Sequence, residues 1–286
     1  MSARIKIIIS MAIFGTIGLF AGPITIASGE LSFWRSIIAL CVLTISFAFS
    51  GGFKALKVTK KQLFLLVLSG SAMAANWIFL FNAYKLTGVA LSTLCYYFAP
   101  ALVIIGSWLL YKEKLTWMQG ICFLVATTGV VLIAVNGGTG EGNAAGIALG
   151  LAAALCYAFV VLVNKSINDM DSRARTFYQF LVAAVFLLPY VYMDSGFAIG
   201  SMDFTGIACL LTLGIIHTGI AYLMYFSALS GLTGQQAATL SYIDPFTAVL
   251  LSVVILQEPL GILQIIGGVA VLAGTLCSEL LPTKKK

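Results

Sequence analysis

The sequence predicts an all-α integral membrane protein with ten transmembrane helices, built from two inverted five-helix repeats and with both termini in the cytoplasm. The first observation is composition: 60% of the residues are hydrophobic and 9% are charged, and the mean hydropathy is +1.05. A soluble domain of this length could not bury so much apolar surface. The second observation is the placement of positive charge, and the third is a segment that occurs twice.

Apolar runs of the length that crosses a bilayer follow one another along the whole chain. A transmembrane helix needs about 20 mainly apolar residues. The expected spans are 5–22, 32–50, 62–84, 88–111, 115–135, 145–164, 175–193, 204–229, 234–256 and 259–281. The first run is as long as a span and leads into nine more, so it is interpreted as a helix and not as a signal peptide.

Lys and Arg residues alternate from side to side as this topology requires. With a cytoplasmic amino terminus, 14 of the 16 Lys and Arg residues fall in inside segments, whereas Lys85 falls in an outside loop and Arg35 within a span. Glu30 and Glu258 are expected in outside loops. This asymmetry follows the positive-inside rule. The net charge of +6 is therefore attributed to topology and not to nucleic-acid binding.

A repeated segment divides the chain into halves. Tyr97 and Pro100 have the same spacing as Tyr242 and Pro245, at an offset of 145 (242 minus 97), and Glu113 and Gln119 fall on Glu258 and Gln264 at the same offset. Duplication of a structural unit explains such a match. The predicted domains are 1–136 and 145–281, followed by a basic cytoplasmic tail at 282–286. Because each unit has five spans, the second enters the membrane inverted, which is a structural basis for alternating access.

The repeated residues resemble a known family. Pro100, Glu113 with Leu115-Thr116, Gln119-Gly120 and Gly129, and the matching Pro245, Glu258, Leu260, Gln264 and Gly274, are similar to the EamA branch of the drug/metabolite transporter superfamily. Phe14-Gly15 and Trp34-Arg35 also resemble its first repeat. The resemblance implies a ten-helix secondary transporter, commonly an exporter of amino acids or small metabolites. It also implies a cavity lined by the first four helices of each repeat.

Two ionisable residues lie deep within predicted spans. Polar groups at that depth are costly unless they face protein or water, so they indicate functional sites. Asp244 shares a helical face with Ser241, and His217 lies on a face that corresponds to that of Asn76 in the other half. Asp244, His217 and Asn76 are therefore predicted to bind substrate, with structural hydrogen bonds as the alternative.

Further substrate-binding candidates are the aromatic and polar residues that recur in both halves. Arg35 is expected either to attract a carboxylate or to extend toward the membrane interface. The remaining candidates are Phe14, Trp34, Tyr96, Tyr97, Tyr157, Gln179, Ser241 and Tyr242. Pro100 and Pro245 are expected to be hinges, because proline interrupts helical hydrogen bonding. Glu113 and Glu258 are expected to be structural.

These residues suit a small amphipathic solute such as an amino acid. Export is the direction that the resemblance to the EamA branch implies. The alternatives are an organic cation or another drug-like metabolite, attracted by Asp244 with nearby Tyr96, and, in other classes, an intramembrane enzyme or a non-transporting sensor. Coupling to protons and facilitated diffusion both fit. No cofactor, metal site or catalytic residue is predicted, and the chain lacks a G-x-x-x-x-G-K-[ST] loop. The expected setting is the cytoplasmic membrane of a prokaryote, as a monomer or weak homo-oligomer.

Overall fold

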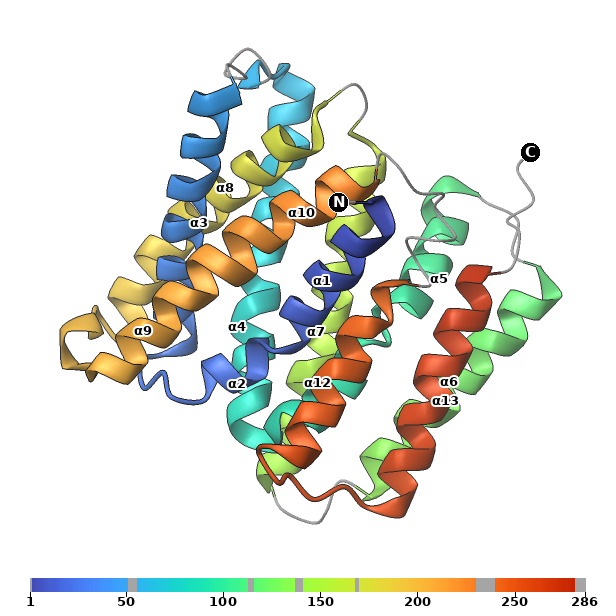
Figure 1. The fold of residues 1–286 in the computed structure, drawn as a ribbon. Coiled ribbons are helices and arrows are strands. Elements are labelled where there is room, and N and C mark those ends of the chain that lie inside the picture. The colour runs from blue at the N-terminus through green and yellow to red at the C-terminus, as the bar shows by residue number, and fades with distance from the viewer. Residues whose placement is uncertain are drawn as a thin grey trace.

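The computed structural model describes residues 2–50, 56–112, 116–136, 141–167, 170–229 and 240–280, and within these ranges the chain forms helices and no strands (Figure 1). The predicted all-helical membrane fold is confirmed. Glu113 lies outside the described residues.

The described part of the first half is helical over most of its length. Its helices are α1 (Ala3–Gly15), α2 (Ile17–Ala21), α3 (Ser28–Ser50), α4 (Lys60–Tyr96), α5 (Ala99–Tyr111) and α6 (Trp117–Asn136). The backbone of α4 leaves the helical conformation at Gly88, where φ is 80° and ψ is 172°. The chain turns back there, so α4 contains both the third predicted span and the start of the fourth (Figure 1).

The second half contains helices with comparable interruptions. They are α7 (Glu141–Lys165), α8 (Ser172–Asp194), η2 (Ile199–Ser201), α9 (Phe204–Thr212), η3 (Leu213–Ile220), α10 (Ala221–Leu229), α12 (Ile243–Val254) and α13 (Ile262–Leu280). The segment η3 is a π-helix that joins α9 to α10. In Figure 1, α1 begins and α13 ends at the same end of the molecule.

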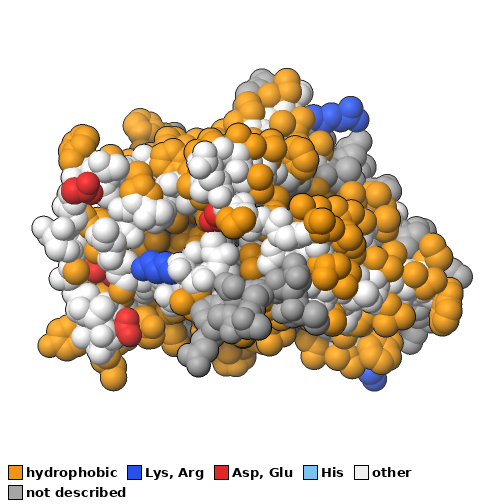
Figure 2. Space-filling model, turned by 90° about the horizontal axis from the view of Figure 1, so that it is seen from below, with side chains coloured by type: hydrophobic (Ala, Val, Ile, Leu, Met, Phe, Trp, Pro, Cys, Tyr) orange, Lys and Arg blue, Asp and Glu red, His pale blue; other side chains and the backbone are white. Residues whose placement is uncertain are grey.

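Helix length and surface character both fit a bilayer. Among the described residues, six helices are long and apolar enough to cross a membrane, and four shorter apolar helices accompany them. Large apolar side chains point outward, including Phe49 at 89%, Phe204 at 87% and Trp117 at 84% exposure. Figure 2 shows hydrophobic side chains over much of one face, with few charged groups among them. Such a surface is stable in lipid and not in water.

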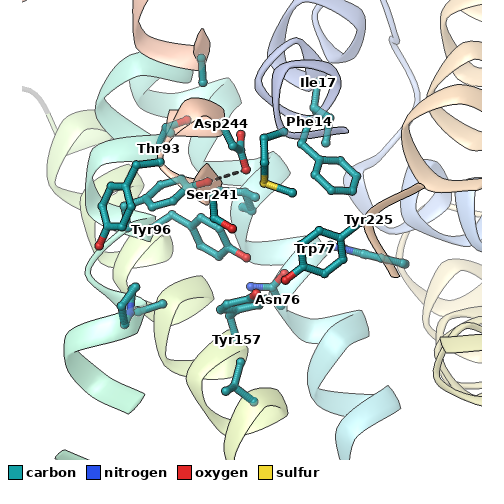
Figure 3. A pocket seen from close by; sticks show the side chains of 18 of the residues that line it. Phe14, Ile17, Asn76, Trp77, Thr93, Tyr96, Tyr157, Tyr225, Ser241 and Asp244 are labelled. Atoms are coloured by element: carbon teal, nitrogen blue, oxygen red, sulfur yellow. Dashed lines mark hydrogen bonds between the residues drawn. The ribbon is translucent and has the colours of Figure 1, made fainter. Parts of the chain in front are cut away.

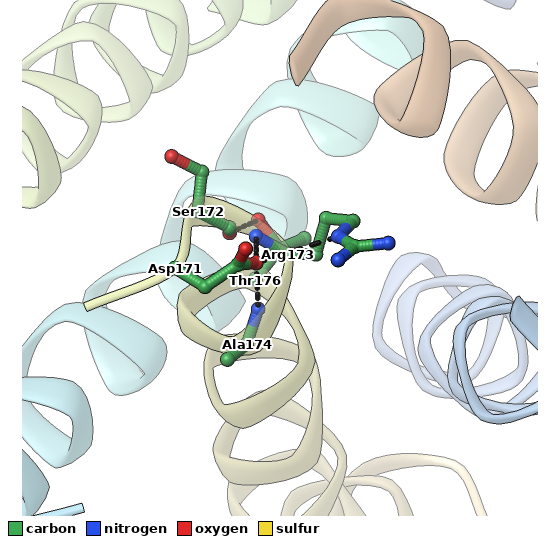
Figure 4. A network of polar contacts seen from close by, with 5 residues as sticks. All are labelled: Asp171, Ser172, Arg173, Ala174 and Thr176. Atoms are coloured by element: carbon green, nitrogen blue, oxygen red, sulfur yellow. Dashed lines mark hydrogen bonds and ion pairs between the residues drawn. The ribbon is translucent and has the colours of Figure 1, made fainter. Parts of the chain in front are cut away.

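Local signals in the sequence fix several helix starts. Thr59 and Gln62 form a reciprocal capping box at the start of α4. Asp171 caps α8 by accepting hydrogen bonds from the backbone N–H groups of Arg173, at 2.8 Å, and Ala174, at 3.3 Å (Figure 4). The same carboxylate lies 3.4 Å from Nε of Arg173. These contacts order the chain where it enters the second helix of the second half.

The two proline segments differ from the sequence-based expectation of kinked continuous helices. Pro100 lies in the first turn of α5, and Pro245 lies in the first turn of α12. Both therefore start a new half-helix, where a missing backbone N–H costs little. Tyr97 (φ −73°, ψ 6°) and Tyr242 (φ −71°, ψ −7°) precede these half-helices with nearly the same backbone conformation.

Helices α6 and α13 pack closely at one side of the molecule (Figure 1). A Cβ atom on Gly129 would lie 2.5 Å from the carbonyl oxygen of Gly267, and one on Gly274 would lie 2.7 Å from the carbonyl oxygen of Cys122. Shifting each position by 145 residues converts one contact into the other (129 to 274, and 122 to 267). This reciprocity is what a two-fold axis between equivalent helices produces.

Candidate functional site

A cavity of about 510 Å³ lies between the two halves. It is lined by residues of α1, α2, α3, α4, α5 and α7 and by residues of α10 and α12. The sequence-predicted site residues that line it are Phe14, Arg35, Asn76, Tyr96, Tyr97, Pro100, Tyr157, Ser241, Tyr242 and Asp244. Figure 3 shows labelled side chains from separate helices projecting into this space.

Asp244 is held at the start of a half-helix. It lies in the first turn of α12, where the partial positive charge of the helix terminus favours a carboxylate. The hydroxyl group of Tyr97 donates a hydrogen bond to its Oδ2 atom (Figure 3). Because Tyr97 precedes α5 and Asp244 begins α12, this bond links the broken helices of opposite halves.

Aromatic rings form much of the remaining wall. Tyr96 lies 5.7 Å from Tyr97 and 5.6 Å from Tyr157, and Tyr97 lies 6.5 Å from Tyr242, measured between ring centroids. Rings at these separations make favourable edge or tilted contacts. The wall therefore combines an apolar surface with hydroxyl groups, which suits a solute that has both apolar and polar parts.

Arg35 supplies the positive charge of the cavity. Its side chain is 4% exposed, and its Nε atom donates a 2.5 Å hydrogen bond to Oγ1 of Thr218. The guanidinium carbon lies 4.9 Å from the ring centroid of Trp77. Arg35 therefore faces the protein interior and does not extend toward the membrane interface, and its attraction for a carboxylate stays a prediction.

Asn76 has a backbone partner across the helix interface. Its Nδ2 atom donates a 2.7 Å hydrogen bond to the carbonyl oxygen of Ala153 in α7, and its side chain is 3% exposed. The contact fixes the amide while Asn76 still contributes to the cavity lining.

Three of the predicted binding residues lie outside the cavity lining. His217 is 1% exposed, with Nε2 at 2.8 Å from Oγ1 of Thr16 and Nδ1 at 3.2 Å from the carbonyl oxygen of Thr212. Because a carbonyl oxygen can only accept, Nδ1 is the donor in the contact with Thr212. The hydroxyl group of Thr16 also lies 2.8 Å from the carbonyl oxygen of Ile13, so its single proton serves either that oxygen or Nε2 of His217. The structure thus does not bring His217 and Asn76 together across the cavity, and a role of His217 in transport stays a prediction.

Gln179 and Trp34 also have partners within the protein. Gln179 donates from Nε2 to Oγ of Ser69 at 3.1 Å and to Oδ1 of Asn164 at 2.9 Å. Trp34 donates from its indole nitrogen to Oε1 of Glu30 at 3.1 Å. These bonds connect α8 to α4 and α7, and brace the first turn of α3.

Two carboxylates expected in outside loops bind backbone N–H groups. Glu258 accepts from Val89 at 2.8 Å and from Ala90 at 2.9 Å, directly after the turn at Gly88, and Ser252 also donates to it. Glu30 is fully buried in the first turn of α3 and not in a loop, because α3 begins at Ser28.

The comparisons with known proteins agree with this architecture. The model of the EamA-like transporter family matches residues 1–135 and 144–279. The chain belongs to the EamA-like transporter family. The fold and the duplicated match together make it a multi-pass transporter of the cell membrane.

Relatives of this EamA-like transporter carry names of the same kind. The uncharacterized transporter YxxF of Bacillus subtilis (strain 168) is 32% identical over 278 residues, covering 94% of this chain and 88% of that protein. YwfM of the same organism, also named an uncharacterized transporter, is 27% identical over 226 residues, covering 78% and 75%. A crystal structure with 18% identity aligns over 96% of both chains with a TM-score of 0.69, which supports the fold.

The cavity of this EamA-like transporter contains residues that the sequence analysis did not select. Six pairs of lining residues are separated by 145 positions: Trp77 and Tyr222, Leu80 and Tyr225, Tyr96 and Ser241, Tyr97 and Tyr242, Ala99 and Asp244, Val103 and Ala248. The repeat offset was therefore the signal that could have found Trp77 and Tyr222. Thr218 gave no such signal, because its importance comes from its contact with Arg35.

Proposed function

We propose that this EamA-like transporter exports a small amphipathic metabolite, an amino acid or a related compound, by alternating access between its two inverted repeats. The observation that carries the proposal is the cavity between the halves, with six pairs of equivalent lining positions. A site shared by two related units can be opened toward either side when the units exchange conformations.

The chemistry of the lining supports this solute class. Among the described residues that line the cavity there is one buried cation, Arg35, and one carboxylate, Asp244, within a wall of aromatic rings. Charged groups inside a membrane protein are expensive and mark substrate pathways. A solute with an anionic group, a cationic group and an apolar body complements such a lining.

The broken helices give the alternating motion a structural basis. Tyr97 and Tyr242 interrupt the fourth and ninth spans next to the cavity, in matching conformations. Discontinuous helices of this kind frame the binding sites of other secondary transporters. We expect the half-helices α5 and α12 to change their orientation during transport, with Asp244 as the residue that exchanges a proton if transport is proton-coupled.

Counterflow in proteoliposomes tests the proposal. Vesicles preloaded with unlabelled L-leucine are expected to accumulate labelled L-leucine, and protein-free vesicles are not. Thermal-shift measurements with amino acids, polyamines and quaternary amines identify better solutes, because a bound ligand raises thermal stability. Absence of counterflow for every solute that stabilises the protein would contradict transport and favour a sensor, whereas chemical conversion of the solute would favour an enzyme.

A second candidate solute is an organic cation. Asp244 lies among Tyr96, Tyr97 and Tyr242, whose rings attract positive charge. Counterflow with tetraethylammonium and not with L-leucine would favour this candidate.

A further inference from the structure

Arg35 is buried in α3, and no carboxylate of the described chain is paired with it. Three carboxylates of the described chain accept hydrogen bonds from neutral donors: Asp244 from Tyr97, Glu258 from the backbone of Val89 and Ala90, and Glu30 from the backbone of Ala198 and Ile199. Within the described residues Arg35 forms no ion pair, and its one hydrogen bond uses Nε. The terminal nitrogens Nη1 and Nη2 therefore remain for another acceptor.

The guanidinium group is oriented by its neighbours. Its carbon lies 4.9 Å from the ring centroid of Trp77 and 5.7 Å from that of Phe81. These two rings of α4 limit the movement of the guanidinium group. Arg35 and Trp77 both line the cavity. An isolated buried charge is costly unless an opposite charge or hydrogen bonds compensate it, so the site favours a ligand that supplies an anionic group.

Thr218 also fixes the orientation of the Arg35 guanidinium group. Its hydroxyl group donates a 2.8 Å hydrogen bond to the carbonyl oxygen of Leu213, five residues earlier, as the π-helical segment η3 permits. Because its proton is used in that bond, the Oγ1 atom presents a lone pair to Nε of Arg35. Thr218 thus holds Arg35 without neutralising it.

Two glycines bring η3 close to α3. A Cβ atom on Gly214 would lie 2.5 Å from Cγ2 of Ile38, and one on Gly219 would lie 2.7 Å from Cγ1 of Val42. Both glycines thus allow an approach that larger residues would block. The close contact places Thr218 against Arg35.

We propose that Arg35 is the anion subsite of the cavity, that its terminal nitrogens bind a carboxylate of the substrate, and that Thr218 is its positioning residue. The inference rests on the proposed function, because it takes the cavity to be the solute site. The planar guanidinium suits a carboxylate, since it offers two parallel N–H donors. The apolar body of the solute then lies against the tyrosines near Asp244.

Calorimetric titration of the purified protein with 4-methylpentanoate tests the subsite directly. This probe has a carboxylate and an apolar body, and isoamylamine is its cationic counterpart. We expect saturable binding of 4-methylpentanoate to the native chain. In Arg35→Gln the affinity is expected to fall about 10-fold to 100-fold, the loss that follows when a charged hydrogen-bonding partner is removed.

Variants of Thr218 separate positioning from folding. Thr218→Val is expected to weaken 4-methylpentanoate binding roughly tenfold while the unfolding temperature without ligand stays near that of the native chain. Thr218→Ser keeps a hydroxyl group and is expected to restore the affinity. Equal losses in binding and unfolding temperature for both variants would overturn the positioning role.

The outcomes also distinguish this inference from the proposed function. Failure of 4-methylpentanoate to bind the native chain, or unchanged binding by a folded Arg35→Gln variant, overturns the anion subsite even if L-leucine counterflow is intact. Loss of all counterflow with carboxylate binding retained leaves Arg35 as an anion site and contradicts transport. Tighter binding of isoamylamine in the native chain than of 4-methylpentanoate also overturns the proposal.

Discussion

The hydroxyl group of Tyr97 donates a hydrogen bond to Asp244, across the boundary between the two halves of the chain. Each residue belongs to a helix break, and the two breaks are related by the repeat. The carboxyl group of one half is thus tied to the helix break of the other. A change in the protonation of Asp244 would alter this contact and, with it, the relation between the half-helices.

Asp244→Asn is expected to flatten the pH dependence of solute counterflow, because the amide cannot gain or release the proton. Polar groups near Asp244 include the hydroxyls of Tyr84, Tyr96, Tyr97 and Tyr222, and Arg35 lines the same cavity. Tyr97→Phe is the matched control, since it removes the hydrogen bond but keeps the carboxylate and therefore a pH dependence. Initial rates measured between pH 5 and pH 9 check this, and an unchanged profile in Asp244→Asn excludes Asp244 from coupling.

Glu258→Gln is expected to lower the free energy of unfolding by about 1–3 kcal/mol, because a half-buried carboxylate that accepts backbone N–H groups loses its charge. The matched control is Asp194→Asn, at the exposed end of α8, which is expected to leave stability nearly unchanged. Thermal unfolding in detergent measures both. Equal stability of the two variants would show that the bond between Glu258 and the start of the second part of α4 is dispensable.

Gly129→Ala is expected to destabilise the protein by about 1–3 kcal/mol, because the added carbon would meet the backbone of α13 at 2.5 Å. Gly120→Ala in the same helix has no atom within 4 Å of the added carbon. Since alanine favours a helix over glycine, this control is expected to be neutral or stabilising by up to about 1 kcal/mol. Thermal unfolding of both variants measures the difference, and equal unfolding temperatures would contradict tight packing of α6 against α13.

Gly88→Ala is expected to impair folding more than Gly196→Ala. Both glycines have positive φ, 80° and 66°, so both substitutions incur backbone strain of about 1–3 kcal/mol. At Gly88 the added carbon would also lie 2.7 Å from the carboxyl carbon of Glu258, whereas at Gly196 no atom lies within 4 Å. The yield of monodisperse protein and its unfolding temperature measure the difference, and equal values would contradict a tight turn at Gly88.

Local structure follows the repeat offset outside the cavity as well. Lys112 and Gln257, again 145 positions apart (257 minus 112), both have left-handed backbone conformations, with φ of 53° and 54°. Gln119 and Gln264 likewise both accept a hydrogen bond from a backbone N–H three residues earlier, Thr116 and Gly261. Duplicated sequence folds into duplicated local structure because capping and turn preferences are local.

The expected juxtaposition of His217 with Asn76 did not form, for a reason that lies in the helices. The expectation assumed uninterrupted helices with 3.6 residues per turn. The chain instead has a π-helical segment at His217 and a break at Thr16, and the His217 ring packs 5.1 Å from that of Phe20. A π-turn changes which face later residues occupy.

The sequence by itself determined that the chain lies in a membrane, crosses it in ten spans, is duplicated and resembles the EamA family, since apolar content, span length and repeated motifs are properties of the linear chain. Only the tertiary structure decided that Arg35 and Asp244 share a cavity while His217 does not. The helix breaks at Tyr97 and Tyr242 and the π-helix before Ala221 set which side chains face one another. Contacts between helices depend on those interruptions, and the periodicity of residues along one helix does not predict where the interruptions occur.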